Sequence, residues 1–190
     1  MDIKKEYEYL YNKIVEEHRE VFEKQELDSV AALMADVEAA KRIFLMGVGR
    51  EGIATRSFAM RLMHLGKQVN WIWDDTAPGM YAGDLFIITD GCGQIGHMHY
   101  IIEKAKETGA RVCMITGSPD GYSAKLADTV LFVPAFVYNG TDERVVKSVM
   151  PMGSLFEQHI FMLFDIIILL LQKNMNISAS EMEKRHRNIE

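Results

Sequence analysis

Two glycine-rich segments carry the residues of this chain that are best placed to bind a small molecule. Each follows a short apolar run and precedes a helix-like stretch, and they read Gly47-Val-Gly-Arg-Glu-Gly52 and Asp90-Gly-Cys-Gly-Gln-Ile-Gly96. Glycine at a strand-to-helix turn lets backbone N–H groups approach a ligand where the next helix points its positive end, which favours an anion. Both segments nevertheless contain an acid, Glu51 and Asp90, where an anion site is expected to have a hydroxyl. The pattern predicts one binding crevice with an unusual charge.

The first segment also matches the fingerprint of a dinucleotide-binding unit. Its glycines stand at positions 47, 49 and 52, and Asp74 lies 22 residues beyond Gly52, where such a unit has the acid that binds the ribose. Glu51 argues against this interpretation, because its carboxylate would lie close to the pyrophosphate. Nothing later in the chain indicates a hydride-transfer site, so an NAD-binding Rossmann protein is kept as a lesser alternative.

The composition is that of a soluble globular protein. The chain has 190 residues, of which 48% are hydrophobic and 25% charged, enough for one domain with a real core. The net charge of −6 argues against a nucleic-acid partner, since little here neutralises a phosphate backbone. Cys92 and Cys113 lack metal-ligand spacing and fit a reducing cytoplasm, and residues 1–6 lack the apolar core of a signal peptide. We expect a cytoplasmic protein with no metal site.

Short apolar runs alternate with helix-like stretches through the middle of the chain, which predicts an α/β fold with a five-stranded parallel sheet between helices. The expected strands are residues 43–46, 68–72, 85–89, 112–115 and 130–133. The expected helices between them are residues 53–65, 97–108 and 122–127. Glycines close the first two of these helices, at Gly66 and Gly109. Ligands of such open sheets bind at the carboxyl ends of the strands, where both glycine segments lie.

Helices are also expected before and after the sheet in the sequence. Two precede it, the first with Tyr7, Leu10, Ile14, Val21 and Phe22 as its apolar stripe and the second capped by Asp28 or Ser29. A long apolar helix follows from about 154 to 173, and a short one begins with the capping box Ser178-Ala-Ser-Glu181. We expect a single domain, 1–190, made of a helical arm, a sheet core and C-terminal helices, at residues 1–40, 41–135 and 150–190.

The long apolar helix raises the question of a membrane span. Its most apolar stretch, residues 160–171, is 12 residues long and contains Asp165, against the roughly 20 apolar residues that a span requires. We expect a buried helix and no membrane partner. Because this helix carries more apolar surface than a small sheet can cover, we also expect a homo-oligomer.

Several segments, in this order, resemble the sugar isomerase (SIS) domain family, and most closely its 6-phospho-3-hexuloisomerases. The resemblance covers about residues 5–190, and its most specific segments are Ala59-Met-Arg-Leu-Met-His-Leu-Gly66 and Pro151-Met-Gly-Ser-Leu-Phe-Glu157, followed by Arg185-His-Arg-Asn-Ile-Glu190 at the end. It implies a flavodoxin-like fold, a dimer or homotetramer with sites shared between subunits, and a sugar or sugar-phosphate ligand.

The resemblance implies an aldose–ketose interconversion through an enediol, which needs a base, donors for the enediolate and an anchor for the phosphate, and no metal or redox cofactor. Glu157 matches the position of the catalytic glutamate, and His186 that of a histidine expected to enter a neighbouring subunit's site. From Glu157 alone, an acid in the first turn of a helix is the plainer interpretation. The residues expected to contact the ligand are Gly47, Gly49, Arg50, Glu51, Asp90, Gly91, Cys92, Gly93, Gln94 and Thr116.

The chain departs from the family where a phosphate would be held. The family has serine at the position of Glu51, and Ser-Gly-Ser-Gly-Glu-Thr where this chain has Asp90-Gly-Cys-Gly-Gln-Ile95. A phosphate carries close to two negative charges, so these acids would repel it. Two functions stay open: a sugar isomerase that holds its ligand differently, and a non-catalytic SIS module that binds a sugar derivative.

Overall fold

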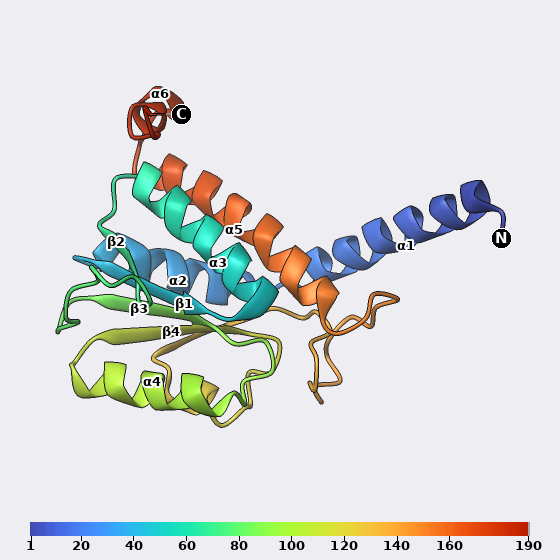
Figure 1. The fold of residues 1–190 in the computed structure, drawn as a ribbon, viewed down its shortest axis with the longest axis horizontal. Helices are drawn as coiled ribbons and strands as arrows, with labels where there is room; N and C mark the ends of the chain where they lie inside the picture. Colours follow the sequence, from blue (N-terminus) through green and yellow to red (C-terminus); the bar gives the residue numbers. More distant parts are fainter. Residues whose placement is uncertain (190) are drawn as a thin grey trace.

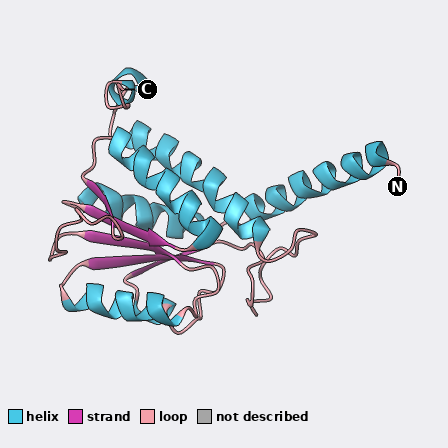
Figure 2. Cartoon of the chain, in the orientation of Figure 1, coloured by secondary structure: helices cyan, strands magenta, loops and turns pink. Residues whose placement is uncertain are grey.

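The chain forms one sheet of five parallel strands in the order β2-β1-β3-β4-β5 (Figures 1 and 2). The computed structural model describes residues 1–189. The strands are β1 Ile43–Gly47, β2 Val69–Trp71, β3 Leu85–Thr89, β4 Arg111–Thr116 and β5 Thr129–Phe132. The predicted α/β fold, with its five-stranded parallel sheet between helices, is confirmed. Because β2 and β3 flank β1 on opposite sides, the strand order reverses between β1 and β3, and ligands of such sheets bind at this point.

Alternate side chains of each strand enter two separate cores, one on each face of the sheet. Ile43 and Leu45 of β1 belong to the core beneath helices α2, α3 and α5, whereas Phe44 and Met46 belong to the core beneath α4. All four are buried. This two-sided burial explains why the strands read as continuous apolar runs.

The helices cover both faces of the sheet, with α4 on one and α2, α3 and α5 on the opposite one (Figure 1). They are α1 Ile3–Lys24, α2 Leu27–Ala39, α3 Gly49–His64, α4 Gly96–Glu107, α5 Ser154–Asn174 and α6 Ala179–Glu183. The predicted ends at Gly66 and Gly109 are confirmed, since both have positive φ, of 93° and 79°. The capping box is also confirmed, because Ser178 Oγ accepts from the Glu181 N–H and Glu181 accepts from the Ser178 N–H.

Three local predictions were wrong. The third helix begins at Gly49, not at residue 53, so the first glycine segment is itself the opening turn of α3. The helix predicted over 122–127 is a single 3-10 turn, Ala124–Leu126. Helix α2 has Glu26 at its N-cap without a side-chain cap, and Ser29 lies inside the helix, donating to the Glu26 carbonyl. In each case a short polar segment was compatible with more than one backbone conformation.

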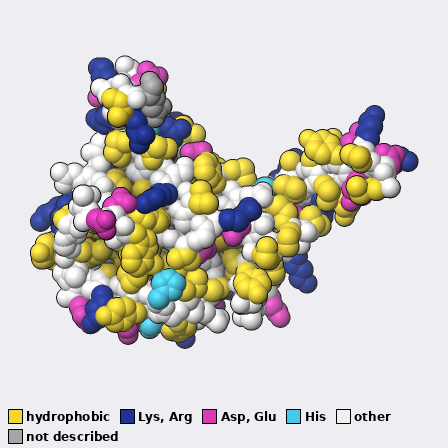
Figure 3. All heavy atoms as spheres, viewed as in Figure 1, with side chains coloured by type: hydrophobic (Ala, Val, Ile, Leu, Met, Phe, Trp, Pro, Cys, Tyr) yellow, Lys and Arg dark blue, Asp and Glu magenta, His cyan; other side chains and the backbone are white. Residues whose placement is uncertain are grey.

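Helix α1 projects from the body of the structure (Figure 1) and carries hydrophobic side chains along its free half (Figure 3). Tyr7 and Leu10 of the predicted stripe are exposed, at 68% and 39%, and only Val21 is fully buried. A lone helix in water is marginally stable, and apolar residues on it gain nothing without a partner surface. The arm therefore supports the expectation of an oligomer.

Helix α5 is 21 residues long and apolar enough, by length and composition, to cross a membrane. The helix predicted from about 154 to 173 is confirmed, and it extends beyond its 12-residue apolar stretch at both ends. Half of its most apolar window is buried inside the structure, and it packs against α1, α2 and α3. Its burial, and not its length, is what indicates a core helix.

Helix α3 lies against strand β1 through two glycines. A Cβ at Gly52 would come within 2.6 Å of the Gly47 carbonyl oxygen, and one at Gly47 would come within 2.9 Å of the Gly52 Cα. Both obstacles are backbone atoms, which cannot rotate away. The close approach fixes the first turn of α3 at the carboxyl end of β1.

This contact predicts a large difference between two glycine-to-alanine variants. Gly52→Ala should lower the free energy of unfolding by about 1–3 kcal/mol or more, because the backbones must separate. Gly96→Ala, in the first turn of α4, has open space around its Cβ and should change it by less than about 0.5 kcal/mol. Denaturant unfolding of both variants measures the difference, and equal effects would contradict the proposed contact.

Candidate functional site

A cavity of about 380 Å³ lies at the carboxyl ends of β1 and β3, where the strand order reverses. Three segments line it: the start of α3, the turn after β3, and the loop that leads into α5. Of the predicted site residues, the cavity brings together Gly49, Arg50, Glu51, Gly91, Cys92 and Glu157. Both glycine segments and the glutamate of α5 thus meet in one crevice.

Glu157 lies in the first turns of α5 and reaches the crevice. The Glu157 N–H donates to the carbonyl of Gly153. Residue 153 must be glycine, because its φ is 80° and a Cβ there would collide with the Tyr138 backbone. Glu157 Oε2 lies 2.6 Å from Arg50 Nε, in an ion pair between α5 and α3. This oxygen is buried and, among the described residues, lacks a hydrogen-bond partner of good geometry. A carboxylate with a lone pair still unused can accept a proton from a ligand.

Glu51 lies on the same wall, partly buried, and its Oε2 accepts a hydrogen bond of 2.9 Å from the Gly91 N–H. Burial raises the pKa of Glu51 to about 8; the Gly91 N–H opposes this shift, and the charges of Asp90 and Glu157 add to it. At neutral pH the Glu51 carboxyl is therefore protonated and neutral.

Asp90 lies beneath the cavity wall, fully buried. Its Oδ1 accepts from the Gly93 N–H at 2.9 Å and its Oδ2 from the Ile95 N–H at 3.3 Å, so the carboxyl group closes its own turn. The Cys92 thiol also points at it, with Sγ 3.5 Å from Oδ1. Burial raises the pKa of Asp90, and these hydrogen bonds partly offset the shift.

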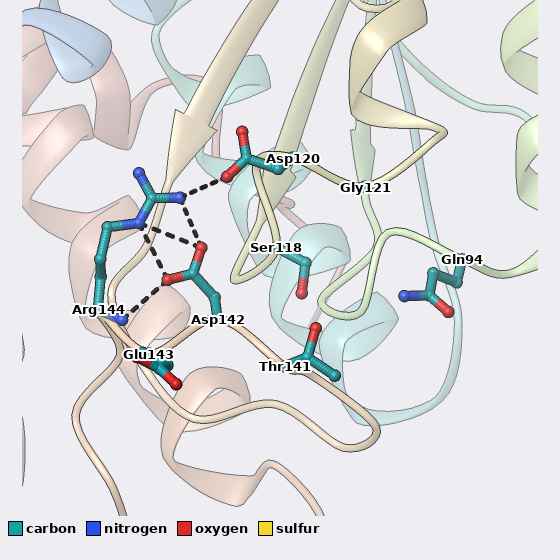
Figure 4. A pocket seen from close by; sticks show the side chains of 8 residues that line it. All are labelled: Gln94, Ser118, Asp120, Gly121, Thr141, Asp142, Glu143 and Arg144. Carbon is teal, nitrogen blue, oxygen red and sulfur yellow. Dashed lines mark hydrogen bonds and ion pairs between the residues drawn. The ribbon is translucent and has the colours of Figure 1, made fainter.

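The other predicted contact residues, in the turn and at the strand ends, lie outside the lining of the main crevice. Thr116 is buried and donates to the Gly91 carbonyl, which holds the turn in place. Gln94 lines a neighbouring cavity of about 430 Å³ at the ends of β4 and β5. Figure 4 shows the Arg144 guanidinium of this second cavity between the carboxylates of Asp120 and Asp142. Gly47 packs against α3, and Gly93 takes a positive φ of 66°.

His186 lies at the far end of α3 from the crevice of its own chain. Its ring stacks on that of His64, the last residue of α3, with centroids 5.4 Å apart, and Arg185 donates to the His64 carbonyl. Helix α3 has 16 residues, so about 24 Å separates this contact from the crevice. Within one chain His186 and Glu157 are not brought together. The last residue of this predicted segment, Glu190, lies outside the described residues.

Sequence reasoning missed the groups that extend the crevice along α5. A further cavity, of about 500 Å³, is lined by Arg50 and Glu157 together with His18, Gln158 and Phe161. The loop 134–153, which supplies Val137 and Tyr138 to the main crevice, was also missed. Gln158 directly follows Glu157, but no pattern in the sequence indicates that His18, on α1, folds back against α5.

The strand order and the position of Asp74 do not favour the dinucleotide alternative. In the mononucleotide-binding halves of a Rossmann fold, β3 lies beyond β2, whereas here it lies on the other side of β1. Asp74 is exposed and pairs with Arg56 of α3 at 3.0 Å. Within residues 1–189, no group of three His, Cys, Asp or Glu residues is arranged to hold a metal ion.

Residues 37–160 match the SIS domain family. The chain belongs to this family. It is 37% identical to a 3-hexulose-6-phosphate isomerase of Mycobacterium gastri over 163 residues, 86% of this chain and 81% of that one. It is 35% identical to a protein of the same name from Methanocaldococcus jannaschii, over 87% and 85% of the two chains. A crystal structure from Methanococcus jannaschii, described as inferring a 3-hexulose-6-phosphate isomerase function, superposes with a TM-score of 0.80 at 28% identity, over 98% and 99% of the chains.

The buried, neutral Glu51 carboxyl predicts a specific pH dependence of stability. Below about pH 4.5 the group is protonated in both the folded and the unfolded chain; between there and about pH 8 only the folded chain keeps the proton. The free energy of unfolding should therefore fall as pH rises through this range, by at most about 1.4 kcal/mol for each unit of pKa difference. In Glu51→Gln this contribution should vanish.

Denaturant unfolding of both proteins at pH 5 and pH 8.5 measures the effect. Asp165→Asn, which neutralises an exposed carboxyl of α5, serves as the control and should follow the native protein. Parallel pH profiles for the native protein and Glu51→Gln would show that the Glu51 carboxyl is not held neutral.

Proposed function

We propose that this protein is a sugar isomerase of the 6-phospho-3-hexuloisomerase type, which moves a carbonyl group between neighbouring carbons of a sugar phosphate or a related sugar derivative through an enediol. Membership of the SIS family and relatives named 3-hexulose-6-phosphate isomerase support the proposal. The observation that carries it is the Glu157 carboxylate, which lies in the crevice with a buried oxygen beside Arg50.

In this proposal Glu157 is the base. It removes the proton from the carbon that bears a hydroxyl next to the carbonyl carbon, and the electron pair forms the enediolate. The same carboxyl returns the proton to the former carbonyl carbon, while one hydroxyl proton moves between the two oxygens. Arg50 and the protonated Glu51 carboxyl line the same crevice and offer donors to the enediolate oxygens.

His186 completes the site from another subunit in this proposal. Within one chain it lies at the wrong end of α3, so it reaches a crevice only in an assembly that brings the end of one α3 to the start of another. The exposed apolar residues of α1, and those of α5 such as Leu169 at 56% exposure, offer surfaces for such an assembly. We assign this activity to the cytoplasm, which the two free cysteines fit.

A non-catalytic SIS module that binds a sugar derivative is the second candidate. The observation that favours it is the pair of acids in the glycine segments, Glu51 and Asp90, which depart from the family pattern. Turnover separates the two candidates, because only the isomerase converts a bound sugar.

The proposed base predicts that Glu157→Gln loses activity without losing the ligand. The kcat for converting 3-hexulose 6-phosphate, or whichever sugar of a panel of ketoses, aldoses and amino sugars is turned over, should fall by about 100-fold or more. The KM should change only a few-fold, because the glutamine side chain has the same size as the glutamate that it replaces. Exchange of substrate hydrogen for deuterium in D₂O should fall in parallel.

Asp165→Asn, on the exposed side of the same helix, is the matched control and should keep full activity. A Glu157→Gln variant as active as the native enzyme would exclude Glu157 as the base. A native protein that binds sugars and converts none of the panel would favour the non-catalytic module.

Shared sites predict complementation between two inactive variants. Light scattering at micromolar concentration should report a dimer or tetramer. When Glu157→Gln and His186→Ala are unfolded, mixed and refolded together, mixed assemblies regain some intact sites, giving about a quarter of native activity for random pairing in a dimer. A monomer, or no recovery on mixing, would contradict a site completed by His186 of another subunit.

A further inference from the structure

The backbone N–H groups of the turn after β3 are already occupied by the chain's own carboxyl groups. Gly91 N–H donates to Glu51, and Gly93 and Ile95 N–H donate to Asp90, at 2.9, 2.9 and 3.3 Å. A ring of such N–H groups at the start of a helix is where an anion binds. Here two side chains, one from each glycine segment, already accept these hydrogen bonds.

The fit of the Glu51 carboxyl against the turn is close. A Cβ on Gly91 would lie 3.0 Å from Glu51 Oε2 and 3.1 to 3.2 Å from Val137 and Phe156, so glycine is needed to admit the carboxyl group. The wall around it is apolar on the side of the α5 loop. An incoming anion would have to displace Glu51 from a fitted position and not merely approach it.

The charges around the crevice also disfavour an anion. Arg50 is the cation that lines the cavity, and it already pairs with Glu157. Asp90 lies directly behind the wall of the cavity. The positive form of His97, which lies near Asp90, would offset the charge of the Asp90 carboxylate. Like charges within a few ångströms repel strongly in a partly buried site.

We infer that Glu51 and Asp90 occupy the place of a phosphate between the two glycine segments, so that the crevice accepts at this end a hydrogen-bond donor without negative charge, a sugar hydroxyl or an ammonium group. This inference rests on the proposed function, because it concerns the substrate of the same crevice. It makes Glu51 and Asp90 determinants of specificity: they select against sugars whose phosphate must enter this end.

The test is a gain of anion binding when the two carboxyl groups are removed. Isothermal titration calorimetry at pH 7 and low salt compares the native protein with Glu51→Ser/Asp90→Ser, using inorganic phosphate and fructose 6-phosphate as probes. The double variant should bind both probes at least tenfold more tightly than the native protein. No gain in the folded double variant, or tight phosphate binding by the native protein, overturns the inference.

Two further variants separate occupation of the turn from a general change of charge. Asp74→Ser/Asp165→Ser also removes two acids, both exposed and outside the crevice, and should bind phosphate as the native protein does. Glu51→Gln/Asp90→Asn removes both carboxyl groups but keeps an amide oxygen as acceptor at each position of the turn, and should stay within threefold of the native protein. A gain in either variant equal to that of the serine variant overturns the inference.

The native protein gives a second measurement if the serine variant does not fold. Ligand-observed NMR should show that fructose 6-phosphate binds no more tightly than fructose; a tenfold preference for the phosphate overturns the inference.

The proposed function is tested separately, by turnover and its loss in Glu157→Gln. A native protein that isomerises a phosphorylated hexulose with a KM tenfold below that of the unphosphorylated sugar keeps the proposed function and excludes the inference. If the serine variant gains phosphate binding but the native protein converts no sugar, the inference holds and the proposed function is excluded.

Discussion

The contact between the backbones of Gly47 and Gly52 is the constraint on which the crevice depends. A side chain at either position would collide with the other backbone, so α3 reaches β1 only with glycine at both. That contact places the opening turn of α3 at the end of the strand, and Arg50 and Glu51 project from this turn into the crevice. The contact between two glycine backbones, which carry no charge, therefore positions the ionisable side chains of the site.

The two carboxyl groups of the crevice differ because their surroundings differ. Glu157 lies 2.6 Å from a guanidinium nitrogen, whereas Glu51 accepts from a backbone N–H beside Val137 and Phe156, and burial raises its pKa to about 8. A site with one carboxylate and one carboxylic acid at neutral pH holds both a base and an O–H donor. The base removes the proton beside a carbonyl, and the O–H donor stabilises the oxygen that gains charge. The acid that fills the turn is thus compatible with the proposed chemistry, even though it disfavours an anion there.

Strand positions and the location of the crevice could be predicted from the sequence because both follow from local patterns. Apolar runs such as 85–89 bury both faces of a strand, and glycine segments at strand ends mark the binding edge of a parallel sheet. The start of α3 at Gly49 could not be predicted, since helix propensity disfavours glycine and only the contact with β1 overrides it. The contribution of His18 and of the loop 134–153 depends on tertiary packing, which leaves no period in the sequence.

The positions of the two histidine pairs bear on the proposed sharing of sites between subunits. His18 and His159 lie at the end of α5 near the crevice, with 3.3 Å between their Nδ1 atoms, whereas His64 and His186 stack at the opposite end of α3. Burial lowers the pKa of His159 to about 3, so it stays neutral and structural at neutral pH. His186 is instead exposed on a short C-terminal segment. Of these four histidines only His186 is exposed, and the proposed assembly would bring it to the crevice of a second copy.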